Sequence, residues 1–186
     1  MDSVILIILY ILAGIVGVVI VALLMSFIVL LILRVPFVRT PKHAIEALVK
    51  SGLITEKDLV YDLGAGDGKF LHELVKATGC QAEGFELSPF FWFFGELRAG
   101  RSKKWKMHLQ NFLQIDLSEP TVIFTFLAPA GLPALNNKLK NEVRPETLII
   151  SYGFEFKDLS LQKIIDPQPE NPKGSRFYIY KKMPVS

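Results

Sequence analysis

Two carboxylates and a short run of glycines are the residues whose spacing best suits chemistry. Asp62 stands two positions before the first glycine of the loop Gly64-Ala65-Gly66-Asp67-Gly68, and Glu86 comes 24 residues after Asp62. Glycines that follow a strand let the backbone turn tightly and approach a ligand. A carboxylate at Asp62 would repel a pyrophosphate but suits a zwitterionic ligand that carries a sulfonium group. An acid at the distance of Glu86 is placed to accept hydrogen bonds from both hydroxyls of a ribose.

The glycine spacing decides between two kinds of nucleotide-like ligand. It is G-x-G-x-G rather than G-x-G-x-x-G, so the dinucleotide fingerprint is not matched. A glycine loop alone is weak support for any site, because turns are rich in glycine. The alternative is an α/β domain with an incidental glycine loop and a surface glutamate.

These residues need neighbouring strands and helices to hold them. Helices are predicted from Thr40-Pro41 to Gly52, over 69–78, from Pro89 onward and over about 132–141. The Thr40 hydroxyl is expected to cap the first of them. Seven strands are predicted over 59–63, 82–86, 106–109, 121–127, 147–152, 161–165 and 176–180. Strands that alternate with helices predict an α/β domain, with a parallel sheet covered by helices on both faces.

The loop and the second predicted strand resemble a known superfamily. Asp62 through Gly68 is similar to the first motif, and Gly84-Phe85-Glu86 to the second motif, of class I S-adenosylmethionine-dependent methyltransferases. The resemblance implies a Rossmann-like domain with a mostly parallel seven-stranded sheet and S-adenosyl-L-methionine as cofactor. The cofactor-binding residues that it implies are Asp62, Gly64, Ala65, Gly66, Gly68, Glu86, Asn111 and Phe112. Many relatives have an acid where this chain has Asn111, whose amide can still hydrogen-bond an adenine while Phe112 packs on the base.

Further segments resemble one small group of membrane-anchored methyltransferases. They are Phe37-Val38-Arg39-Thr40-Pro41, Glu86-Leu87-Ser88-Pro89 and Leu97-Arg98-Ala99. The group includes the mitochondrial lysine methyltransferases that act on the c-ring protein of ATP synthase and on the adenine nucleotide translocase. The resemblance implies N-methylation of a lysine on a membrane-associated protein.

Other acceptors and roles stay open at this point. The stretch Phe126-Leu127-Ala128-Pro129 replaces the Asn-Pro-Pro-Tyr signature of amide and nucleobase amino methyltransferases, which disfavours nucleic acid and glutamine substrates. A lipid or quinone-like small molecule is a second acceptor class, and a non-catalytic cofactor-binding scaffold is a third reading. Tyr152 ends the fifth predicted strand and Glu155 follows it, and either could receive the proton of the acceptor or orient it. Structural roles suit both residues better, so the catalytic residue is unknown.

The N-terminal segment predicts a membrane anchor. The chain is 51% hydrophobic, and Val4–Leu33 is a run of 30 residues without a charge. The remainder is about one-quarter charged, as in a soluble domain. A cleaved signal peptide would need a positive n-region and a shorter apolar stretch. We therefore expect a single transmembrane helix over residues 1–33 and a methyltransferase domain over 34–186.

Flanking charges predict on which side of the membrane the domain lies. Asp2 precedes the apolar segment, whereas Arg34, Arg39 and Lys42 follow it. This asymmetry favours a cytoplasmic, or equivalent inner, location for the catalytic domain. The single cysteine, Cys80, agrees with that compartment because it can form no disulfide within the chain.

Two further predictions concern partners. The three histidines (His43, His72 and His108) show no ligand spacing, so no metal is expected. The aromatic run 90–94 precedes five basic residues between Arg98 and Lys106. Part of that run must pack on the sheet, and the rest predicts a face that rests on anionic lipid. Nucleic acid is the weaker interpretation, because no reader motif accompanies the charges.

Overall fold

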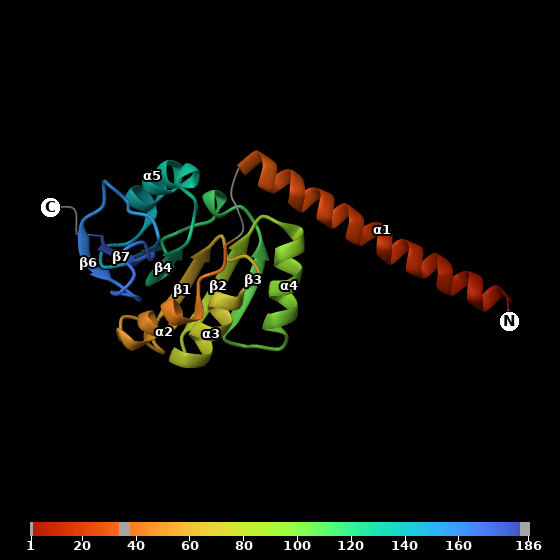
Figure 1. Cartoon of the computed structure of the whole chain (residues 1–186), viewed down its shortest axis with the longest axis horizontal. Coiled ribbons are helices and arrows are strands. Elements are labelled where there is room, and N and C mark those ends of the chain that lie inside the picture. Colours follow the sequence, from red (N-terminus) through yellow and green to blue (C-terminus); the bar gives the residue numbers. More distant parts are fainter. Residues whose placement is uncertain (1, 34–37, 183–186) are drawn as a thin grey trace.

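A seven-stranded sheet forms the centre of the domain (Figure 1). The computed structural model describes residues 2–33 and 38–182. The strands lie in the order β3-β2-β1-β4-β5-β7-β6. Their bounds are β1 Leu59–Leu63, β2 Gln81–Glu86, β3 Trp105–Leu109, β4 Val122–Thr125, β5 Leu148–Tyr152, β6 Leu161–Ile165 and β7 Phe177–Lys181.

The sheet is mixed, which corrects the expectation of a mostly parallel sheet. Strands β1 to β5 pair in parallel, whereas β7 pairs antiparallel with both β5 and β6. The reason is the connection between the last two strands. Residues 166–176 turn directly from β6 to β7 without a helix, and a direct turn joins antiparallel strands, whereas parallel neighbours need a crossover.

Helices cover both faces of this sheet. One face carries α2 (Lys42–Lys50), α3 (Lys69–Thr78) and α4 (Pro89–Ala99), and the other carries α5 (Leu132–Glu142). In α3 the apolar residues recur at helical spacing, so Phe70, Leu71, Leu74 and Val75 are all buried. Burial of this face fixes the helix that follows the glycine loop against the sheet.

The predicted element boundaries hold to within a few residues. The prediction for α3 agrees with the structure, whereas α2 begins at Lys42 with Pro41 as its N-cap. No side chain caps α2, so the expectation that the Thr40 hydroxyl caps this helix is wrong. The predicted boundary at Arg34 lies outside the described residues.

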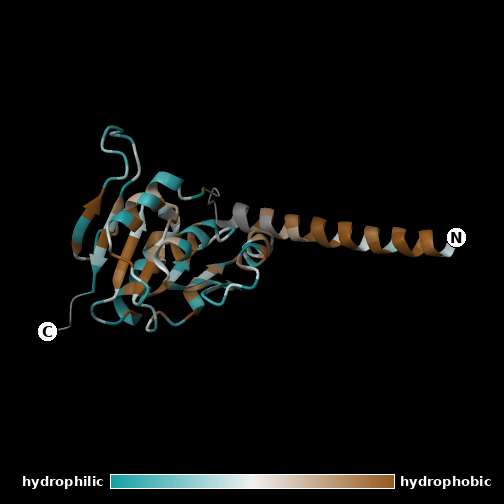
Figure 2. Ribbon diagram, turned by 90° about the horizontal axis from the view of Figure 1, so that it is seen from below, coloured by the Kyte–Doolittle hydropathy of each residue, from teal (hydrophilic) through white to brown (hydrophobic). Residues whose placement is uncertain are grey.

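The N-terminal helix α1 (Asp2–Leu33) projects away from the domain (Figure 2). Its stretch Ser3–Met25 is long and apolar enough to cross a membrane, and that stretch is not buried within the protein. The helix contacts α4 near the domain. Length and composition therefore permit a membrane span.

Candidate functional site

The ends of three adjacent strands bring the predicted site residues to one edge of the sheet. β1 ends at Leu63 and opens into the glycine loop, β2 ends at Glu86, and Asn111 follows β3 by two residues. The strands neighbour each other in the order β3-β2-β1, and β1 also borders β4. Ligands of open α/β sheets bind at the carboxyl ends of the strands, where the strand order reverses.

Glu86 holds the glycine loop in place. Its Oε2 accepts a hydrogen bond from the Gly66 backbone N–H at 2.8 Å, and its Oε1 accepts one from the Ser88 N–H at 2.7 Å. A carboxylate offers about four acceptor sites, which is more than the backbone donors Gly66, Ser88 and Leu87 use. Glu86 is therefore built into the site and can still accept from ligand hydroxyls.

The backbone of the loop requires glycine at specific positions. Gly64, Gly66 and Gly68 have φ values of 88°, 57° and 68°, a region that other residues rarely adopt. A Cβ on Gly68 would lie 2.9 Å from Trp105, and one on Gly64 would lie 2.9 Å from Leu127. Gly68 thus allows close packing of α3 against β3, whereas the Gly66 N–H faces Glu86.

Asp62 is a buried carboxylate without a hydrogen-bond donor. Asp62 is only 2% exposed, and no described residue donates a hydrogen bond to its side chain. Burial, with a smaller contribution from the nearby Glu86 charge, raises the pKa of Asp62 well above its ordinary value. A cationic group of a ligand would satisfy this carboxylate.

The pKa of Glu86 is also raised, but hydrogen bonds to its carboxylate make the increase smaller. Burial raises its pKa, while hydrogen bonds from the backbone of Ser88, Gly66 and Leu87 act in the opposite direction. The raised pKa values mean that burial favours the neutral form of both acids, and a positively charged ligand at this sheet edge would favour their ionised forms. Such a donor set fits a ligand that carries positive charge together with hydroxyl groups.

Two arginines converge on Asp67 within the loop. Arg39 donates to Asp67 Oδ2 through Nη2 at 2.9 Å, and Arg98 Nη2 donates to the same oxygen at 2.9 Å. Arg98 Nε also donates to the Asp67 backbone carbonyl at 3.0 Å. Burial alone would raise the pKa of Asp67, but the hydrogen bond and charge of Arg39, with the charge of Arg98, lower it.

From the sequence, Arg39 counts among the charges that flank the apolar segment and Arg98 belongs to the basic stretch, but none of the three residues was expected to act at the glycine loop. Arg39 and Arg98 each lie in a segment that resembles the membrane-anchored methyltransferases. Their presence in those two segments was the sequence feature that could have pointed to a shared contact. In the structure, the segment before α2 and the helix α4 meet at the glycine loop.

The remaining predicted residues lie around the loop. Ala65 is buried, and its N–H donates to the Phe85 carbonyl at 3.1 Å. Asn111 Oδ1 accepts from the Leu113 N–H at 2.9 Å and so begins a short 3-10 helix, which leaves the Asn111 amide NH2 available as a donor. Phe112 is partly buried against the core on the α5 side of the sheet. Whether these residues bind a cofactor stays a prediction.

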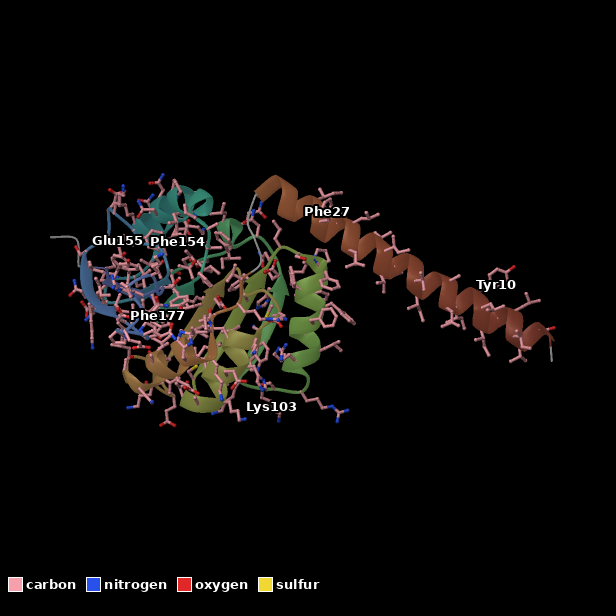
Figure 3. All side chains as sticks on the ribbon, in the orientation of Figure 1. Tyr10, Phe27, Lys103, Phe154, Glu155 and Phe177 are labelled. Atoms are coloured by element: carbon pink, nitrogen blue, oxygen red, sulfur yellow. The ribbon has the colours of Figure 1, made fainter. Side chains whose placement is uncertain are left out.

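Tyr152 and Glu155 lie in different environments. Tyr152 is buried, with ring centroids 4.9 Å from Phe126 and 4.6 Å from Phe177, and burial raises its pKa. Glu155 is exposed in the loop after β5 (Figure 3). We assign no catalytic base. Among residues 2–33 and 38–182 no group of three or more His, Cys, Asp or Glu side chains is arranged to hold a metal ion.

Solved structures share this fold. An RNA methyltransferase from Salinibacter ruber, crystallised with S-adenosyl-L-homocysteine, matches with a TM-score of 0.71 over 80% of this chain and 96% of its own, at 23% identity. A putative methyltransferase from Escherichia coli matches with a TM-score of 0.63 over 81% of this chain and 91% of its own, at 16% identity. At these identities the likeness establishes the fold.

Curated relatives match in sequence. A protein-lysine N-methyltransferase of Saccharolobus islandicus is 27% identical over 153 residues, which cover 79% of this chain and 93% of the relative. The human lysine N-methyltransferase of the ATP synthase C-subunit is 27% identical over 65% of this chain. The mouse adenine nucleotide translocase lysine N-methyltransferase is 30% identical over 66% of it. This chain spans about half the length of the two mammalian relatives.

A family model for the ANTKMT methyltransferase domain matches residues 62–163. That range starts at Asp62, includes the glycine loop, Glu86 and Asn111, and ends within β6. The match covers more than half of the chain, and the chain therefore belongs to the ANTKMT methyltransferase domain family.

Proposed function

We propose that this protein is a membrane-anchored methyltransferase that uses S-adenosyl-L-methionine to N-methylate a lysine of a membrane-associated protein. The observation that carries the proposal is the pair of buried acids, Asp62 and Glu86, beside the glycine loop at one sheet edge, in a chain of a methyltransferase family. The lysine specificity of the curated relatives supports the choice of acceptor.

The donor set of the site fits the cofactor. No described residue donates to Asp62, which would accept from the cationic methionine portion, and Glu86 keeps acceptor capacity for a ribose hydroxyl. Asn111 and Phe112 follow β3 next to Glu86, where they would contact the adenine. Gly66 permits close approach because it carries no side chain.

The protein contributes binding and alignment rather than a nucleophile. The cofactor supplies a methyl group bonded to a positively charged sulfur. The lone pair of the neutral lysine amine forms the new N–C bond as the C–S bond breaks, its electrons stay on sulfur, and the amine loses one proton. A free lysine has a pKa of ~10.4, so deprotonating its amine at pH 7 costs roughly 4–5 kcal/mol. A low-dielectric site beside a bilayer reduces that cost, because desolvation lowers the pKa of a lysine.

The anchor part of the proposal is based on α1. The 23 residues Ser3–Met25 span about 35 Å, enough to cross a hydrocarbon core of ~30 Å. The positive residues Arg34, Arg39 and Lys42 follow the helix and favour an inner location for the domain. The tether keeps the site near membrane-embedded acceptors.

Methyl labelling tests the proposal directly. Membranes from a strain that lacks this protein are incubated with tritiated S-adenosyl-L-methionine and the purified full chain, and labelled species are resolved by gel and mass spectrometry. We expect protease-sensitive label on a methylated lysine, and none with Asp62→Ala. Label that survives protease and extracts with lipid would contradict a protein acceptor. Absence of label, with intact cofactor binding, would indicate a non-catalytic scaffold.

A further inference from the structure

The helix α4 carries apolar side chains on two opposite faces. Trp92 and Ala99 pack on the core of the sheet, and Gly95 is buried against Met107. The spacing i, i+3, i+4, i+7 then places Phe90, Phe93, Phe94 and Leu97 on one outer face. We call these four residues the outer face of α4. A helix that is apolar all round is normally buried on all sides.

This outer face remains largely open. Phe93, Phe94 and Leu97 are 52%, 43% and 61% exposed. The rings of Phe90, Phe93 and Phe94 form one cluster, with centroids 5.0 Å apart for Phe90 and Phe94 and 5.8 Å apart for Phe93 and Phe94. A contiguous exposed aromatic patch marks an interaction surface.

The outer face lies on the side of the domain from which α1 leaves. Figure 1 shows α4 at the margin of the domain that faces α1, and α1 contacts α4. Phe27 lies on the part of α1 near the domain (Figure 3). Eight helical residues, 26–33, follow the apolar span Ser3–Met25, so a tilted α1 leaves α4 beside the bilayer surface.

The charges near α4 divide into two groups. Three of the five basic residues have partners within the domain: Arg98 pairs with Asp67, Lys104 donates to the Gly79 carbonyl, and Lys106 pairs with Glu83. Lys104 and Lys106 are exposed as well but are held by these partners, and the other two exposed basic residues, Arg101 and Lys103, follow the C-terminal end of α4. They can reach anionic headgroups beside an inserted aromatic face.

We infer that the outer face of α4 inserts into the headgroup and acyl boundary of the bilayer that α1 spans. The inference rests on the proposed membrane anchoring. We assign lipid as the partner of the outer face of α4, because this face lies beside the apolar helix α1 and is followed by the cations Arg101 and Lys103. Insertion would orient the domain, since α4 begins three residues after Glu86 and holds the cofactor loop through Arg98. The carboxyl edge of the sheet would then lie close to the membrane surface.

Spin labels on the full chain test this placement. The buried Cys80 is replaced by alanine, and one cysteine is introduced in turn by Leu97→Cys, Phe93→Cys, Leu161→Cys or Ile15→Cys. Each labelled protein is placed, one copy per nanodisc, in phosphatidylcholine with phosphatidylglycerol. Collision rates with oxygen and with a water-soluble nickel complex are compared. Leu161 is a matched control, because it is an exposed leucine of β6 at the end of the domain away from α1 (Figure 1).

We expect labels at 97 and 93 to collide more with oxygen than with nickel, as the label at 15 does, and the label at 161 to show the reverse. Nickel-accessible labels at 97 and 93 beside a lipid-exposed label at 15 would overturn the inference alone. Immobile labels at 97 and 93, shielded from both reagents, would indicate a protein occupant and would also overturn it. A nickel-accessible label at 15 would overturn the anchoring proposal as well. Calorimetric binding of S-adenosyl-L-methionine checks that each labelled protein is folded.

Discussion

Asp62 and Glu86 share one edge of the sheet, but the protein surrounds them differently. Glu86 accepts from the backbone of the loop and of the α4 N-terminus, whereas Asp62 has no donor among the described residues. Asp62 stabilises the folded state only when protonated, because its folded pKa is raised. That contribution is complete below the unfolded pKa and is lost as the pH rises through the folded pKa.

This linkage predicts proton release on cofactor binding. A cationic ligand stabilises the charged form of Asp62 and lowers its pKa, so affinity for S-adenosyl-L-methionine increases as the pH rises toward the raised pKa of the free protein. Titration calorimetry in buffers of different ionisation enthalpy counts the released protons.

The variant Asp62→Asn serves as the control for that measurement. We expect it to release fewer protons and to bind the cofactor more weakly, while it unfolds at a higher temperature at neutral pH because it buries no charge. Equal proton release by the wild type and the variant would contradict the assigned role of Asp62.

Glu86→Ala tests the second carboxylate. The change removes acceptors for the ribose and the tie to the Gly66 N–H, and charge-assisted hydrogen bonds are worth about 1.5–3 kcal/mol each. We expect affinity for S-adenosyl-L-methionine to fall at least ~10-fold by calorimetry. The matched control is Glu83→Ala, an acid of the same strand that pairs with Lys106 and His108, and it should bind normally. Equal affinity of wild type and Glu86→Ala would make Glu86 a structural residue only.

Sequence reasoning could locate Asp62 and Glu86 but not the Arg39–Asp67–Arg98 cluster. The first two follow predicted strands, and the carboxyl ends of adjacent parallel strands meet at one edge. The cluster joins residues 28 and 31 positions apart in the chain. No local spacing encodes such an ion pair, because it depends on how α4 and the segment before α2 pack around the loop.

At the scale of elements, α4 connects the glycine loop with the outer face of α4. Arg98→Met should lower affinity for S-adenosyl-L-methionine several-fold and lower the melting temperature, because Asp67 loses two of its hydrogen bonds. Calorimetry and thermal unfolding measure both effects. Arg101→Met is the matched control, since Arg101 is exposed three residues further on. An Arg98→Met protein that binds as tightly as Arg101→Met would show that α4 does not hold the loop.

Hydrophobic periodicity was sufficient to place the helices and strands, but not the strand directions. The buried runs of β5 and β7 look alike, because a buried strand shows the same pattern whether its neighbour is parallel or antiparallel. The mixed sheet follows from the turn over 166–176, whose path is a tertiary property. The contacts of Lys104 with Gly79 and of Lys106 with Glu83 could not be predicted either, because they also depend on tertiary packing.

At the scale of the whole molecule, the anchor should act through local concentration. A chain that begins at Arg34 should bind S-adenosyl-L-methionine normally yet methylate its membrane acceptor far more slowly than the full chain, because tethering restricts the search for the acceptor. Initial rates of tritium transfer to membranes and to a soluble peptide of the acceptor compare the two proteins. Equal rates of both proteins on membranes would contradict the tethering argument.

Cofactor binding at the glycine loop is the central property to test, and titration calorimetry with S-adenosyl-L-methionine measures it. Two variants place valine at a glycine of positive φ: Gly66→Val in the loop and Gly52→Val in open space after α2, where φ is 68°. Both variants strain the backbone, so thermal unfolding should show a loss of stability in each. We predict one bound cofactor per chain in the wild type and in Gly52→Val, and no binding in Gly66→Val. Unchanged affinity in Gly66→Val would contradict this prediction.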